Sequence, residues 1–127
     1  MVTNRVFSEG IDYAGDMVIG AFVVGPPLPG FDFEREKMKD YYENFYNAGF
    51  DYAYTYPAMA KAVQAAGRVI RSERDKGIII LMDDRFLEKN YYQSLPQDWF
   101  TETPRELVSK SILSDVSDFW SRSTYDE

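Results

Sequence analysis

The sequence predicts a three-layer α/β fold, with a partly parallel sheet flanked by helices. Residues 17–24 and residues 77–82 are two uncharged apolar stretches bounded by turn residues, as buried parallel strands are. Helical patterns fill the chain between them, which implies a crossover connection, and such crossovers are right-handed almost without exception. We therefore expect the two stretches to be neighbouring central strands. At 127 residues, the chain is expected to form one domain, residues 1–127.

A helix is predicted from residue 56 to residue 71, directly before the second apolar stretch. Pro57 suits the first helical turn, because its missing N–H would have no partner there. Several strong helix formers follow it. The apolar side of this helix is expected to consist of Ala62, Val63, Ala66 and Ile70.

Polar residues of the same stretch point to a phosphate ligand. Gln64, Arg68 and Arg71 have the spacing of residues on one helix face. The guanidinium fork of arginine is well suited to phosphate oxygens. The same arginines could instead be solvated or paired with Glu73 and Asp75, and the spacing alone favours that simpler interpretation.

Two further helices are expected. The first runs from about Phe33 to Asn47, with Asp32 as its N-cap and residues 47–49 as its stop. Its aromatic stripe is typical of core packing rather than of a platform for stacking bases. The second helix opens with a capping box at residues 103–106 and continues to about Trp120. The proline-rich loop 25–30 ends the first strand, where it could meet a ligand or act as a rigid connector.

Composition excludes several classes of protein. The net charge of −7 argues against a freestanding nucleic-acid binder, which needs a basic patch to displace counterions. The absence of Cys and His rules out disulfides, thiolate metal sites, histidine-ligated zinc and a Ser-His-Asp triad. No apolar run approaches a membrane span, and no signal peptide is visible. We expect a soluble protein that is cytoplasmic, or nuclear if eukaryotic.

Three segments together resemble a known family. The segment Gln64-Ala-Ala-Gly-Arg-Val-Ile-Arg71 matches the Q-x-x-G-R-x-x-R pattern of motif VI in superfamily 2 helicases. The continuation through residues 75–86 looks like the XPD/DinG branch of that superfamily. Residues 7–13, Phe-Ser-Glu-Gly-Ile-Asp-Tyr, resemble motif V of the same branch. The resemblance covers nearly the whole chain and implies part of the second RecA-like motor domain of an ATP-dependent DNA helicase that moves 5′–3′ along single-stranded DNA.

The resemblance also implies roles for individual residues. Arg68 and Arg71 would be catalytic, stabilising charge on the γ-phosphate of ATP, and Gln64 would orient the attacking water or the phosphate. The residues expected to line the nucleotide cleft are Glu9, Gly10, Asp12 and Gly67. Without the resemblance, the segment around Glu9 and Asp12 would be interpreted as a solvated loop.

Two residues after the second strand allow two interpretations. Asp83 and Arg85 match the D-x-R of the family at this strand end. They could also simply pair and pin the turn, which is the interpretation we favour.

Other parts of such an enzyme are missing from the sequence. It has no G-x-x-x-x-G-K-[ST] loop, no Walker-B-like acidic motif, and none of the cysteines that would hold the iron–sulfur cluster of the family. We therefore expect a fragment or a truncated reading frame, inactive alone, that shares ATP and Mg²⁺ with a missing first motor domain. The alternative is a non-enzymatic RecA-like module that binds a protein partner through its acidic, aromatic surface.

Overall fold

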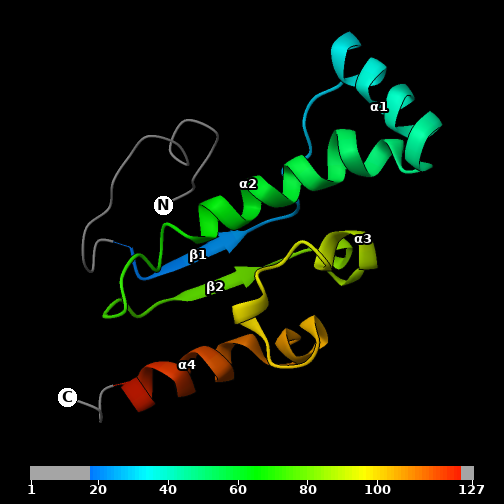
Figure 1. Cartoon of the computed structure of the whole chain (residues 1–127). Helices are drawn as coiled ribbons and strands as arrows, with labels where there is room; N and C mark the ends of the chain where they lie inside the picture. The colour runs from blue at the N-terminus through cyan, green and yellow to red at the C-terminus, as the bar shows by residue number, and fades with distance from the viewer. Residues whose placement is uncertain (1–17, 124–127) are drawn as a thin grey trace. The chain divides into compact units, whose positions relative to one another are not determined.

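The computed structural model describes residues 18–123 (Figure 1). The chain divides into two compact units, residues 1–96 and residues 97–127. The described part of the first unit holds the strands β1 (Gly20–Val23) and β2 (Ile78–Leu81), and the helices α1 (Phe33–Tyr46), η2 (Asp51–Thr55), α2 (Tyr56–Ala66), η3 (Asp84–Leu87) and α3 (Lys89–Tyr92). The second unit holds η4 (Gln97–Trp99), η5 (Pro104–Leu107) and α4 (Ile112–Ser123).

The strands β1 and β2 pair in parallel, with Gly20 opposite Ile78 and Val23 opposite Leu81. The prediction that they are parallel neighbours is therefore confirmed. So is the α/β class, because helix α2 contacts β1 and the small parallel sheet is flanked by helices, as in a partial RecA-like fold. The predicted burial of β1 on both faces is wrong. Its residues alternate between exposed and half-buried, because the sheet has two strands among residues 18–123.

The carboxyl ends of the two strands meet at Gly25 and Asp83. Gly25 has φ +90°, a backbone conformation that residues with a side chain rarely adopt. A Cβ at this position would lie 3.1 Å from Asp83 Oδ2. Arg85 donates from Nε and Nη2 to the two oxygens of Asp83, at 2.8 and 2.9 Å. These bonds hold the pKa of Asp83 down at about 2. The pair therefore pins the turn after β2, as we favoured.

Helix α1 begins and ends as predicted. The Asp32 side chain accepts the backbone N–H of Arg35 at 2.7 Å, so Asp32 is the N-cap. Asn47 adopts the left-handed conformation, with φ 52°, and closes the helix. Gly49 then packs so tightly that a Cβ would clash with the carbonyl of Lys39, and its N–H donates to Glu43 Oε2 at 2.7 Å.

Helix α2 is the buried element of the first unit. It continues directly from η2, a π-helix, and Pro57 lies in its first turn. Ala62 and Ala66 of the predicted apolar side are buried together with Met59, which confirms that part of the prediction, and Val63 is half-buried. The fully or almost fully buried residues of η2 and α2 are Ala53, Thr55, Ala58, Met59, Ala62 and Ala66.

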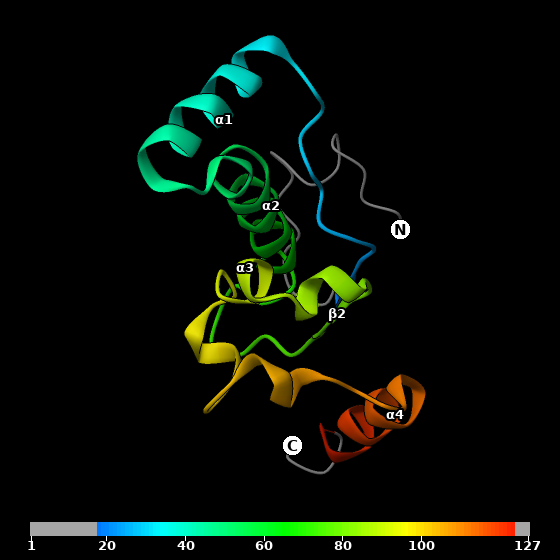
Figure 2. The ribbon, with the colours of Figure 1, turned by 90° about the vertical axis from the view of Figure 1, so that its right-hand side faces the viewer.

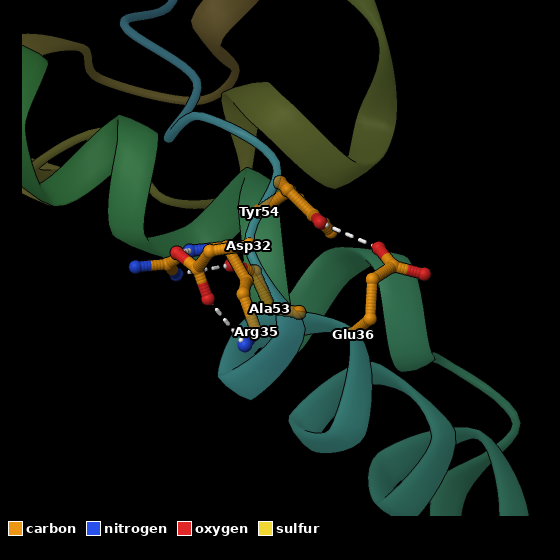
Figure 3. A network of polar contacts seen from close by, with 5 residues as sticks. All are labelled: Asp32, Arg35, Glu36, Ala53 and Tyr54. Atoms are coloured by element: carbon orange, nitrogen blue, oxygen red, sulfur yellow. Dashed lines mark hydrogen bonds and ion pairs between the residues drawn. The ribbon is translucent and has the colours of Figure 1, made fainter.

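Pro57 has no N–H to donate to the carbonyl of Ala53, four residues earlier. In the structure, Nη1 of Arg35 from helix α1 donates to that carbonyl at 2.6 Å (Figure 3). A second bond lies beside it, from the hydroxyl of Tyr54 to Oε1 of Glu36 at 2.5 Å. Helix α1 is therefore held against η2 by its charged side chains.

The predicted core stripe of α1 is wrong. No residue of α1 is buried, and most of its large apolar side chains are exposed. The hydrogen bonds of Arg35 and Glu36 and the stacking of Tyr42 on Tyr52 lie on the inward side of the helix. The outward side carries Met38, Tyr41 and Phe45.

The predicted single helix over residues 103–120 is also wrong. The 3₁₀ helix η5 ends at Leu107, and α4 starts only at Ile112. Between them, Ser109 accepts the backbone N–H of Ser111 at 3.1 Å and bonds to the carboxylate of Asp115. Serine side chains that bond to nearby backbone compete with the helix in this way. The Glu106 half of the capping box is confirmed, because its carboxylate accepts the N–H of Thr103 at 2.6 Å.

Candidate half-site at the end of helix α2

The residues matched to motif VI lie where α2 ends and a turn begins. The last helical residue is Ala66, and the next three form a turn. Within that turn, Arg68 and Val69 donate to carbonyls only three residues back, at 3.2 and 3.0 Å. Such i→i−3 bonds tighten a helix end toward 3₁₀ geometry.

This geometry changes how the candidate residues are arranged. Gln64 lies in the last turn of α2, Arg68 in the tight turn and Arg71 in the loop beyond it. The prediction of a helix to Arg71, with all three on one face, is therefore wrong. Gln64 and Arg71 are exposed and Arg68 is half-buried. Gln64, Arg68 and Arg71 lie on one short segment, but their local conformations differ: helix, turn and loop, respectively.

Gly67 is not required by the fold. Its φ is −62°, which any residue adopts, and an added Cβ would make only ordinary contacts with the carbonyls of Val63 and Gln64, at 3.4 and 3.6 Å. Gly77 differs, because a Cβ there would clash with the Val69 side chain. Gly67 is the C-cap of α2, and its surroundings would accept a side chain.

The loop that carries Arg71 is organised by Asp75. Its Oδ2 accepts the backbone N–H groups of Arg71 and Ser72, at 2.9 and 2.8 Å. These two bonds lower the pKa of Asp75, and the positive charge of Arg71 contributes to the same shift. The sequence suggested Asp75 only as a side-chain partner for an arginine. Asp side chains often accept backbone N–H groups in turns, as Asp75 does here. The position of Asp75 two residues before Gly77 could have indicated such a turn.

Val69 anchors the segment in the core. Its side chain is 4% exposed, whereas the next residue, Ile70, is 41% exposed and lies outside α2. The prediction that Ile70 belongs to the buried side of the helix is wrong. Val69 lies between Arg68 and Arg71 in the sequence. Its buried side chain holds the short segment that carries both arginines against the core.

The other candidate residues cannot be placed beside these. Glu9, Gly10 and Asp12 lie outside the described residues, and their roles stay predictions. Within residues 18–123 there is no group of three acidic, histidine or cysteine side chains that could hold a metal ion. No helix in that part of the chain is long and apolar enough to cross a membrane.

Comparison with known proteins gives consistent matches. Residues 1–102 match the model of the helicase C-terminal domain. The chain is 32% identical over 91 residues, 70% of its length, to an ATP-dependent DNA helicase DinG of Photobacterium profundum. It is 30% identical over 135 aligned residues, 95% of its length, to the XPD helicase subunit of general transcription and DNA repair factor IIH of Dictyostelium discoideum. The chain covers 13% of the first relative and 17% of the second.

Proposed function

Because the chain belongs to the helicase C-terminal domain family, we propose that it supplies one side of a composite ATP site in an XPD/DinG-like DNA helicase. The other side, with the phosphate-binding loop and Mg²⁺, would come from a first motor domain. The activity of the whole enzyme, including translocation in the 5′–3′ direction along single-stranded DNA, is part of this proposal.

The observation that carries the proposal is the segment from Gln64 to Arg71. It combines one carboxamide and two guanidinium groups with a glycine that the fold does not require. A missing side chain on an exposed turn leaves room for close approach by a neighbouring group. Nucleotide bound by the first motor domain is the neighbour that this chemistry fits.

The donor set fits the triphosphate of ATP and does not fit its metal ion. Guanidinium groups bind phosphate oxygens through paired hydrogen bonds, whereas Mg²⁺ is held by carboxylates and water. The described residues contain no acidic cluster for a cation. We therefore assign Mg²⁺ to the first motor domain. Bound ATP would supply the phosphoryl group that is transferred to water.

Each residue of the half-site would act differently. Arg68, half-buried in the tight turn, would be a fixed positive charge near the β- or γ-phosphate. Arg71, on a loop shaped by Asp75, would reach the γ-phosphate as its charge develops. Gln64 would position the attacking water. The segment of Glu9, Gly10 and Asp12 would approach the nucleotide from the motif V side.

The test is Arg71→Ala in a polypeptide that carries both motor domains. We expect DNA-stimulated ATP turnover to fall by on the order of 10³, because an arginine that stabilises the transition state contributes about that much. The melting temperature should barely change, because Arg71 is exposed. Arg71→Lys should restore little, because an ammonium lacks the guanidinium fork.

Arg74→Ala is the matched control, since Arg74 lies in the same exposed loop. It should leave both turnover and melting temperature near those of the parent protein. Near-normal turnover in Arg71→Ala would contradict the proposal at this residue. The 127-residue chain alone should neither hydrolyse ATP appreciably nor bind single-stranded DNA tightly at physiological salt, because it lacks a P-loop and carries a net charge of −7. Turnover by the chain alone would contradict the half-site assignment.

A further inference from the structure

The loop that connects the end of α2 to the start of β2 is anchored at both of its ends (Figures 1 and 2). Val69 is buried at the start of the loop, and Gly77 at its end lies so close that a Cβ there would clash with the Val69 side chain. Ile78 then donates its N–H to the carbonyl of Ile19, just before β1, at 3.0 Å. The fold therefore fixes the two ends of the loop, and the residues between them need contacts of their own.

Asp75 supplies those contacts. Residues 71–74 and Lys76 are exposed, whereas Asp75 is half-buried. Its Oδ2 accepts the N–H groups of Arg71 and Ser72 at 2.9 and 2.8 Å, and its own N–H donates to the Ser72 carbonyl at 3.1 Å. The bond to Arg71 fixes the point at which the Arg71 side chain leaves the backbone.

The carboxylate of Asp75 acts mainly on the backbone of the loop. Its bonds to the N–H groups of Arg71 and Ser72 lower the pKa of Asp75 more than the positive charge of Arg71 does. Asp75 is therefore more than a counter-charge for the Arg71 guanidinium.

These bonds matter more for geometry than for stability. The N–H groups of an exposed loop can donate to water instead, so the loss of the carboxylate would leave no buried donor without a partner. What would be lost is the fixed position of the backbone at Arg71. Misplacing a catalytic group by about 1 Å can lower a rate by on the order of 10²-fold.

We infer that Asp75 is a positioning residue for Arg71: its carboxylate holds the backbone at Arg71 so that the guanidinium group meets the γ-phosphate in one fixed geometry. This inference rests on the proposed function of Arg71. It adds a residue outside the Gln64–Arg71 segment that acts through Arg71 and not on the nucleotide.

The test measures ATP turnover in a polypeptide that carries both motor domains. Asp75→Ala should lower kcat by about 10- to 100-fold and leave the KM for ATP nearly unchanged, since Arg71 would act in the transition state. Asp75→Asn should restore most of the rate, because a carboxamide oxygen can accept the same N–H groups without the charge. Equal losses in the two variants would overturn the inference, because Asp75 would then act through its charge.

The effect of Asp75 should disappear when Arg71 is absent. Adding Asp75→Ala to Arg71→Ala should lower kcat by less than about a further twofold, because the first residue acts through the second. Glu73→Ala is the matched control, since it removes the same charge from the same exposed turn. It should leave kcat near that of the parent protein.

Amide hydrogen exchange in the 127-residue chain gives a readout that does not depend on turnover. Asp75→Ala should speed exchange at Arg71 and Ser72 at least about fivefold and leave the β2 amides unchanged, because only the loop loses its bonds. Glu73→Ala should change neither set of amides. Unchanged exchange at Arg71 in Asp75→Ala would overturn the inference.

The kinetic outcomes separate this inference from the proposed function. Near-parental kcat in Asp75→Ala beside a collapsed Arg71→Ala, or a loss in Asp75→Ala that persists without Arg71, would overturn the inference alone. If Arg71→Ala itself kept its turnover, the proposed role of Arg71 would fail, and the positioning role of Asp75 would fail with it.

Discussion

Helices α1 and α2 are separated in the chain only by η2 and its preceding loop, and they are held by different contacts. Helix α2 buries small side chains and Met59 and is fixed by apolar packing. Helix α1 carries larger apolar side chains but fully buries none of them. Arg35 donates a hydrogen bond to the Ala53 carbonyl, Glu36 accepts one from Tyr54, and Tyr42 stacks on Tyr52. The difference shows that size and hydrophobicity of side chains do not decide which helix face is buried when a neighbouring backbone needs polar partners.

The contrast is tested most strongly by one substitution in each helix. Met59→Ala should lower the free energy of unfolding by about 2–5 kcal/mol, because Met59 is fully buried and its truncation leaves a cavity. Met38→Ala should change it by less than about 0.5 kcal/mol, because Met38 is 44% exposed. Urea unfolding of the 127-residue chain measures both. Similar losses from the two variants would mean that the face of α1 is covered in solution.

A smaller effect is expected from the polar attachment of α1. Arg35→Ala should cost about 1–3 kcal/mol, because it removes a donor from the buried Ala53 carbonyl. Lys37→Ala, on the exposed side, should cost less than about 0.5 kcal/mol. Arg35→Lys should be intermediate, since it keeps the charge and loses the fork. If Arg35→Ala proved as mild as Lys37→Ala, apolar contacts would be what holds α1.

The smallest effect concerns pH. The bond from Tyr54 lowers the pKa of Glu36 below 4.5, so its stabilisation is present above that pH and is lost as pH falls through the lowered value. The same bond raises the pKa of Tyr54 to about 12, so its stabilisation is present below pH 10 and is lost as pH rises toward 12. Chemical denaturation across pH should show both losses.

Glu36→Gln and Tyr54→Phe provide the control for this pH dependence. Each variant should reduce the loss of unfolding free energy at acid pH. The double variant should reduce it no further than either single variant, because both substitutions remove the same hydrogen bond. Additive effects would show that the two residues act separately.

Local sequence patterns predicted the elements well and their environment less well. The apolar stretches gave the two parallel strands, and Asp32 and Asn47 marked the ends of α1, because strand propensity and caps are local properties. The inward face of α1 was missed, because it depends on Ala53, eighteen residues beyond Arg35. Pro57 gave no signal for this contact, because a proline in the first turn of a helix ordinarily leaves no carbonyl without a donor.

The candidate site shows the same division. The spacing of Gln64, Arg68 and Arg71 identified a segment that the family match also covers. We placed these residues on one face by assuming a continuous helix. The structure ends that helix at Ala66, because tight-turn bonds and the Asp75 carboxylate redirect the chain. A motif can therefore be recognised from residue order even where the periodicity used to interpret it is wrong.

The bond between Arg35 and Ala53 also links the opening of two helices. When α1 detaches, the Ala53 carbonyl loses this donor, and Pro57 cannot supply one. The first turn of α2 should then loosen together with α1, as one cooperative unit of local unfolding. Arg35→Ala should therefore speed amide hydrogen exchange at the start of α2, although it changes no residue there. The attachment of α1 would in this way affect the helix that ends in the motif VI residues.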